Sequence, residues 1–156
     1  MADEILGSRL EGTTLVVETR AGEQVYDSRF LVAALLVFVA RGSGRIEPEE
    51  SGKIIELIEE HFHMQSAESL ELITFAMAEM VEKPALPGLL AELGKTLSEK
   101  EKEDIALMGL KVVAADGRRE FAEMEQFERA MAGLGVAPDG VHRAFDRYFS
   151  ETMPGD

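Results

Sequence analysis

The chain contains no cysteine among its 156 residues. Disulfide bonds, thiol chemistry and zinc sites built on cysteine are therefore excluded, while the redox compartment stays open. A long apolar run is also missing: residues 30–40 form the longest one, well short of the roughly 20 residues that span a bilayer. The opening MADEILGSRLEG lacks the basic and apolar stretches of a signal peptide. We therefore expect a cytoplasmic protein without direct membrane insertion.

Basic residues are scarce. The chain has 16 Lys and Arg against 30 Asp and Glu, which gives a formal net charge of −14. A nucleic-acid backbone or an anionic membrane surface would repel most of such a protein, so no nucleic-acid partner is expected. Metal cations and basic protein partners are the classes that this charge favours.

Signatures of catalysis are also lacking. No Ser, His and Asp in a triad order and no nucleophile elbow can be found in the sequence. The glycine-rich RGSGR at residues 41–45 lacks the Gly-Lys-Ser/Thr ending of a phosphate-binding loop. We therefore predict that the protein is not an enzyme.

What the sequence does contain is helical periodicity. Ser28 is a candidate N-cap ahead of RFLVAALLVFVA, which is apolar on every face and fits a buried central helix. Ser98 and Glu101 have the spacing of a capping box at the start of another helix. Together with Gly and Pro residues at the helix boundaries, these patterns predict an all-α fold, a single bundle of about seven helices with short connections.

The N-terminal residues differ from the rest. The stretch TTLVVETRAGEQVYD contains β-branched residues on both sides of a glycine break, which is typical of a short hairpin. A loosely ordered arm is the alternative. The sequence thus predicts a hairpin or arm over residues 1–27, followed by a helical domain over residues 28–150.

An internal repeat appears when the sequence is shifted by 73 positions. Residues 31–58 then fall on residues 104–131, so that Gly44 aligns with Gly117 and Glu50 with Glu123. Each copy reads as an apolar helix, a glycine turn and an amphipathic helix with an acidic first turn. Because neither copy can bury its apolar helix alone, we expect the two helix-turn-helix units to pack together.

The acidic turns resemble part of an EF-hand calcium loop. With Gly117 at position 6 of such a loop, Asp116 stands at position 5 and Glu123 at position 12. Positions 1 and 3 would be Val112 and Ala114, which offer no side-chain oxygen. A structural role is the alternative, because glycine ends the first helix, aspartate favours a turn and acidic residues stabilise the start of the second helix.

The same residues support a family resemblance. An apolar helix ending in AADG, with a Glu seven residues after the Asp and a second copy in the chain, resembles the tellurite-resistance TerB-like family over roughly residues 29–149. The second family motif corresponds to Asp116, Gly117 and Glu123, and the first to Gly44 and Glu50. The resemblance implies an all-α bundle, an acidic surface with metal or metalloid involvement, a stress-related or membrane-associated setting, and no established enzymatic reaction.

Two functional hypotheses follow. The first is a non-enzymatic acidic module that binds a divalent cation or metalloid-related ion in tellurite resistance, although Ser43 replaces the Asp that the family's first motif has. The second is a protein-interaction module that docks a basic partner or a membrane-associated complex through its acidic face. The first hypothesis assigns four metal ligands: Asp116, Glu120, Glu123 and Glu50.

Histidine is an alternative source of metal ligands. His61 and His63 are two positions apart, and on a helix the two rings would point about 200° apart. We therefore interpret both as ordinary residues of a helix end, and His142, which stands alone in the sequence, in the same way.

Overall fold

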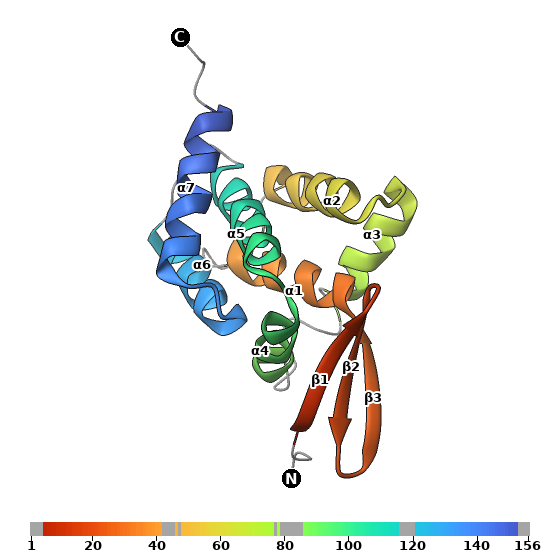
Figure 1. The fold of residues 1–156 in the computed structure, drawn as a ribbon. Coiled ribbons are helices and arrows are strands. Elements are labelled where there is room, and N and C mark those ends of the chain that lie inside the picture. Colours follow the sequence, from red (N-terminus) through yellow and green to blue (C-terminus); the bar gives the residue numbers. More distant parts are fainter. Residues whose placement is uncertain are drawn as a thin grey trace.

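The computed structural model describes residues 5–41, 46, 48–76, 78, 86–115 and 121–152 of the chain. Within these residues, a three-stranded antiparallel sheet precedes a group of seven helices (Figure 1). The strands are β1 (Ile5–Glu11), β2 (Thr14–Thr19) and β3 (Gly22–Asp27). The sheet extends away from the helices, and its order is β1-β2-β3.

The all-α prediction is therefore wrong. The hairpin predicted within TTLVVETRAGEQVYD is present as β2 and β3, and β1 adds a third strand, so residues 5–27 form a complete antiparallel meander. Gly7 and the polar pattern of β1 gave little local signal for a strand. β1 pairs with β2 and is also held by a distant element, because Ser8 Oγ donates a 2.9 Å hydrogen bond to Glu92 Oε1.

The two faces of the sheet have different neighbours. Leu15 and Val17 on β2 are buried in the main core of the protein. Val16 points the other way and is also buried, with Arg9 and Val25 as its cross-strand neighbours. The sheet therefore contributes one face to the core and presents the other to solvent.

The helices follow in chain order. They are α1 (Ser28–Ala40), α2 (Pro48–Phe62), α3 (Ser66–Phe75), α4 (Leu86–Thr96), α5 (Glu99–Ala114), α6 (Phe121–Leu134) and α7 (Pro138–Thr152). No helix in the described part of the chain combines the length and the apolarity needed to cross a bilayer.

Local chemistry sets several helix ends. Asp27, rather than Ser28, caps α1, because its Oδ1 accepts a 2.9 Å hydrogen bond from Arg29 N. The capping box predicted for α5 is present: Glu101 N donates to Ser98 Oγ and Ser98 N donates to Glu101 Oε1. Gly135 ends α6 with a φ of 86°, a left-handed conformation that suits glycine.

The two apolar helices form the centre of the bundle. α1 packs against α5, and the amphipathic helices α2 and α6 each pack against both of them. In α1, ten of 13 residues are buried, so it is covered on nearly all sides. The burial of α1 and α5 thus depends on both helix-turn-helix units and on the sheet and α4.

α4 and α6 touch backbone to backbone. A Cβ placed on Gly94 would stand 1.7 Å from the carbonyl oxygen of Leu134, a distance that no side chain can occupy. The absence of a side chain at residue 94 therefore allows the two helices to approach this closely.

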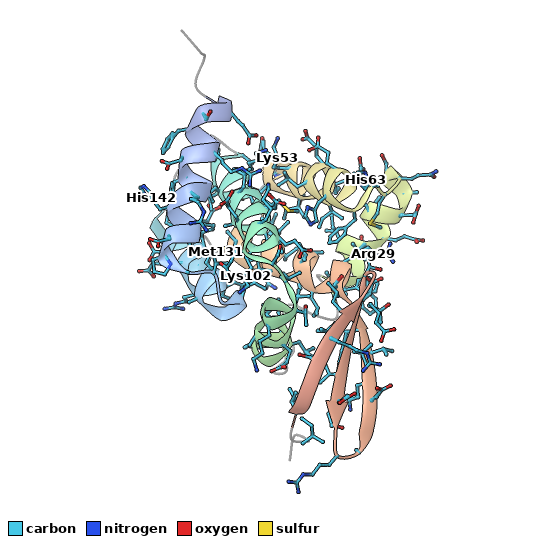
Figure 2. The ribbon with its side chains drawn as sticks, in the orientation of Figure 1. Arg29, Lys53, His63, Lys102, Met131 and His142 are labelled. Atoms are coloured by element: carbon cyan, nitrogen blue, oxygen red, sulfur yellow. The ribbon has the colours of Figure 1, made fainter. Side chains whose placement is uncertain are left out.

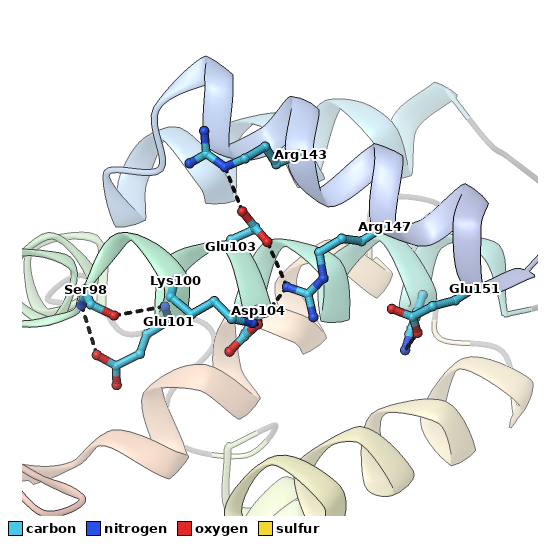
Figure 3. A network of polar contacts seen from close by, with 9 residues as sticks. Ser98, Lys100, Glu101, Glu103, Asp104, Arg143, Arg147 and Glu151 are labelled. Carbon is cyan, nitrogen blue, oxygen red and sulfur yellow. Dashed lines mark hydrogen bonds and ion pairs between the residues drawn. The ribbon is translucent and has the colours of Figure 1, made fainter.

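α7 is held on α5 by a network of ion pairs (Figure 3). Arg147 Nη1 lies 2.9 Å from Glu103 Oε2 and 2.7 Å from Asp104 Oδ1, and Arg143 Nε lies 2.7 Å from Glu103 Oε1. The two arginines lower the pKa of Glu103. Burial alone would raise the pKa of Asp104, but hydrogen bonds from Arg147 and Lys100 outweigh it and lower that pKa.

Replacing Gly94 by Ala should destabilise the protein by about 1 to 3 kcal/mol, because the methyl group would force α4 and α6 apart. Gly52→Ala is the matched control: residue 52 lies in α2 with nothing within 4 Å of an added Cβ. It should stabilise the protein by about 0.5 to 1 kcal/mol through helix propensity. Urea unfolding of both variants measures the difference, and an equal effect of the two substitutions would contradict the close approach.

The ion pairs between α5 and α7 predict an acid-sensitive stability. The pKa values of Glu103 and Asp104 are lowered in the folded state. The two ionised carboxylates therefore contribute fully to folding stability above their ordinary pKa values of 4.5 and 3.8. This contribution is lost as the pH falls through the lowered pKa values of the folded protein. Arg147→Gln should therefore flatten the acid limb of stability between about pH 5 and pH 2. Arg129→Gln, at an exposed position of α6, should leave it unchanged. Urea midpoints across this pH range provide the test.

Candidate functional site

Two carboxylates occupy equivalent places in the two helix-turn-helix units. Glu50 is the third residue of α2, and Glu123 is the third residue of α6. Both have an exposed fraction of 0%. Buried carboxylates are uncommon in proteins, since the charged form must be stabilised by hydrogen bonds, by an opposite charge or by a metal ion.

Both glutamates belong to the core-facing stripe of their helix. In α2 the stripe continues from Glu50 through Ile54 and Ile58, and each of these two residues is at most 1% exposed. In α6 it continues from Glu123 through Phe127 and Met131 at the same spacing. An apolar side chain would fit the first position of such a stripe, yet both units have glutamate there.

The surroundings of Glu123 place it near one end of α1. Gln126 follows Glu123 by one turn of α6, and its Nε2 lies 3.5 Å from the carbonyl oxygen of Phe38 in the last turn of α1. Glu123 and Glu50 also lie in the first turns of their helices, where the helix dipole favours negative charge. Both carboxylates therefore lie at the positive end of a helix dipole.

The other two predicted ligands cannot be placed. Asp116 and Glu120 lie outside the described residues, as does Gly117. Among the residues that the structure describes, no group of three or more His, Asp or Glu side chains is arranged to hold a metal ion. Of the four predicted ligands, the structure thus describes Glu50 and Glu123, and both are buried at helix starts.

The histidines do not converge on this region. His63 lies just past the end of α2, and His142 lies on α7 (Figure 2). His142 is exposed and lies 3.7 Å from Asp146. His63 has a φ of 56° in the turn after α2, so it does not continue the helix that carries His61. These positions agree with the interpretation of His61 and His63 as residues of a helix end.

His61 lines a small cavity at the junction of the sheet with the helices. The cavity has a volume of about 80 Å³, and its walls include Thr13 of the β1–β2 turn, Ser28 of α1 and Glu101 of α5. Burial lowers the pKa of His61 below its ordinary 6.5, against the attraction of Asp104 and Glu101. No sequence pattern indicates this cavity, because its walls come from parts of the chain that are far apart.

Two further hollows lie around α5. An apolar one of about 140 Å³ is bordered by α5, α6 and α7, with Met124, Phe145 and Tyr148 among its walls. A larger groove of about 410 Å³ lies between α2 and α5 and contains Lys53 and Lys111. Lys53 lies 3.2 Å from Glu56 and Lys111 lies 3.1 Å from Glu151, so these amines already have acidic partners.

Sequence reasoning missed one buried carboxylate. Glu92 on α4 is 7% exposed and accepts hydrogen bonds from Lys95 and from Ser8 of β1, both at 2.9 Å. The Lys95 hydrogen bond lowers the pKa of Glu92, and the Ser8 bond adds to this against the effect of burial. The Glu92–Lys95 spacing could have been noticed, but the contact with β1 could not. Its partners make Glu92 a link between sheet and bundle.

Comparison with known proteins covers the helical part of the chain. A family model described as "Tellurite resistance protein TerB" matches residues 29–146, which is most of the chain and includes both helix-turn-helix units. The three strands precede the matched region. No curated protein and no solved structure matches the chain.

The lowered pKa of His61 predicts a loss of stability in mildly acidic solution. Protonation favours the unfolded state, so stability should fall as the pH drops from the ordinary 6.5 through the lowered value in the folded protein. His61→Gln should remove this slope, whereas His142→Gln on the exposed face of α7 should retain it. Thermal unfolding across this pH range, with the imidazole titration followed by NMR, measures both. A titration of His61 above 6.5 would contradict the prediction.

Proposed function

Because the chain belongs to the TerB family of tellurite resistance proteins, we propose that its helical domain is a non-enzymatic module that binds a divalent cation. The observation that carries the proposal is the pair of fully buried glutamates, Glu50 and Glu123, at the first position of an otherwise apolar stripe in each unit. The departure from the apolar pattern recurs at the same position of both units, and it places two hard oxygen donors at equivalent helix starts, which is what a cation site needs.

The chemistry of the donors selects the class of ion. Carboxylate oxygens are hard ligands and suit Mg²⁺, Ca²⁺ or Mn²⁺ better than soft metals. Tellurite itself is an oxyanion, and the field of a chain with net charge −14 would repel it. The proposed ligand is therefore a cation that accompanies the resistance response, and Asp116 and Glu120 are the proposed additional ligands.

The proposal also includes the cellular location and the process in which the module works. A module of this kind holds an ion and performs no reaction on it, and it works in the cytoplasm as part of a stress response. The net charge also favours a second candidate, a protein-interaction module with a basic partner or a membrane-associated complex. The two candidates differ in whether binding needs a metal ion.

A divalent cation in large excess over its dissociation constant should stabilise the protein by roughly 1 to 3 kcal/mol. Glu50→Gln and Glu123→Gln should each remove most of this increment. Glu49→Gln and Glu125→Gln are matched controls, because they remove the same charge from exposed positions of the same two helices. Both controls should keep the increment. Thermal unfolding with Ca²⁺, Mg²⁺, Mn²⁺ and Zn²⁺, each against NaCl of equal ionic strength, measures it.

The comparison uses the increment caused by the cation rather than absolute stability, so a purely structural role of either glutamate does not affect the result. The proposal would be refuted if no divalent ion raised the thermal midpoint of the wild type above its value in NaCl of equal ionic strength. Retention of the increment in both buried variants would place the ion elsewhere.

A further inference from the structure

The outer strand of the sheet has one edge without a neighbour in the described part of the chain. α4 packs against β1, whereas β3 packs against β2 and, where it leads into α1, against that helix. Figure 1 shows β3 on the side of the sheet away from α4. Residues 22–25 are exposed along this edge. An edge of this kind presents backbone donors and acceptors that another strand can pair with.

The hydrogen-bond pattern identifies the backbone groups that point outward. Ser28 N donates a 2.7 Å hydrogen bond to Thr13 O at one end of the β2–β3 pair, and a two-residue turn joins Thr19 to Gly22 at the other. Antiparallel strands alternate between hydrogen-bonded and non-bonded positions. The even-numbered residues of β3 therefore exchange backbone hydrogen bonds with β2. The N–H and C=O groups of Glu23 and Val25 point to the open edge.

The side chains beside these groups define the chemistry of a partner. Val25 is 66% exposed and lies on the outer face of the sheet. Glu23 lies on the same face opposite Glu18, and Glu11 is also acidic there. Arg9 pairs with all three carboxylates, which flank it along the strands, so this face has an acidic excess around Arg9. An apolar residue opposite Val25 and a basic residue opposite Glu23 would complement it.

The same charges disfavour pairing with a second copy of the chain. If two β3 strands paired antiparallel with Val25 opposite Val25, Glu23 of each copy would face Asp27 of the other. Like charges directly opposite each other destabilise a strand pair. Edge charges of one sign thus protect the protein from self-association while leaving the edge open to a partner of opposite charge.

We propose that the β3 edge binds an extended segment of a basic protein partner by strand addition, with the partner's β-branched apolar residue opposite Val25 and its lysine or arginine opposite Glu23. Main-chain hydrogen bonds to Glu23 and Val25 supply affinity, and the two side-chain contacts supply specificity. The inference does not depend on the proposed cation site, because it uses only residues of the sheet.

The probe is a fluorescent peptide with a central Lys-Thr-Val-Thr-Lys, whose symmetry places a lysine opposite Glu23 in either strand direction. Val25→Pro removes the outward N–H and keeps the pairing with β2, since proline is tolerated on edge strands. Val25→Thr is the matched control, which keeps that N–H and the β-branched shape. Fluorescence anisotropy of the full chain should show binding to the wild type and to Val25→Thr. Binding to Val25→Pro should be weaker by about tenfold or more, equivalent to 1.4 kcal/mol.

Charge selectivity and amide exchange make the test specific. A Glu-Thr-Val-Thr-Glu peptide should not bind the wild type, whereas Glu23→Lys should weaken binding of the lysine peptide. In the wild type, the lysine peptide should slow hydrogen exchange at the amides of Glu23 and Val25. The exchange measurement uses the wild type, so it tests binding at the β3 edge even if Val25→Pro fails to fold.

Three results would overturn the proposal. The first is evidence against the β3 edge: the lysine peptide binds Val25→Pro as well as it binds the wild type, or it does not slow amide hydrogen exchange at Glu23 and Val25. The second is evidence against a basic partner: the lysine peptide does not bind the wild type, or the lysine and glutamate peptides bind it equally. The third is a wild-type dimer that Val25→Pro dissociates, which would make a second copy the occupant of the edge.

Discussion

The mutual burial of α1 and α5 is the constraint on which the rest of the structure depends. Ten of the 13 residues of α1 are buried, and eight residues of α5 are buried as well. A helix segment that is apolar on most faces, such as α1 and the part of α5 from Ile105 onward, cannot be stable at a surface and must be covered by several neighbours. The two helix-turn-helix units supply each other's cover, and the sheet, α3 and α4 complete it around α1.

This constraint makes the two buried glutamates informative. The stripe positions of α2 and α6 contact the central helices and therefore favour apolar side chains, as Ile54 and Phe127 show. Glutamate at the first position of both stripes brings negative charge into the edge of that core. Helix dipoles reduce the cost but would do so equally well for exposed carboxylates such as Glu49. Burial therefore distinguishes Glu50 and Glu123 from the exposed acidic residues of the same helix turns, and the proposed cation site is based on it.

Most of the helical part could be predicted because its signals are local. Apolar periodicity, the Ser98–Glu101 capping box and glycine boundaries lie within a few residues of the helices that they specify. The resemblance to the TerB family, based on two short motifs, is confirmed. β1 was missed because part of what holds it is non-local: besides its pairing with β2, Ser8 hydrogen-bonds to Glu92, 84 positions away. The contact between Gly94 and Leu134 is equally non-local, and no pattern around either residue indicates it.

The candidate site was only partly predictable for the same reason. The repeat identified Glu50 and Glu123 as equivalent, but the sequence could not show that both are fully buried, since burial depends on how α2 and α6 pack across the central helices. The division into residues 1–27 and 28–150 stays a prediction. The match over residues 29–146 shows only that the family's pattern begins after the sheet.

The two proposed sites lie toward opposite ends of α1. β3 leads directly into its first turn, where Asp27 caps the helix and pairs with Arg29 and where Ser28 N binds Thr13 O. Glu123 is one turn from Gln126, which contacts Phe38 near the other end of α1. A helix of 13 residues is about 20 Å long at 1.5 Å per residue, so the two ligands would not touch. Coupling between binding at the two sites would require α1 to move within its packed surroundings. Because α1 is almost completely buried, such a movement would disturb the packing of its neighbours, so we expect the two sites to bind independently.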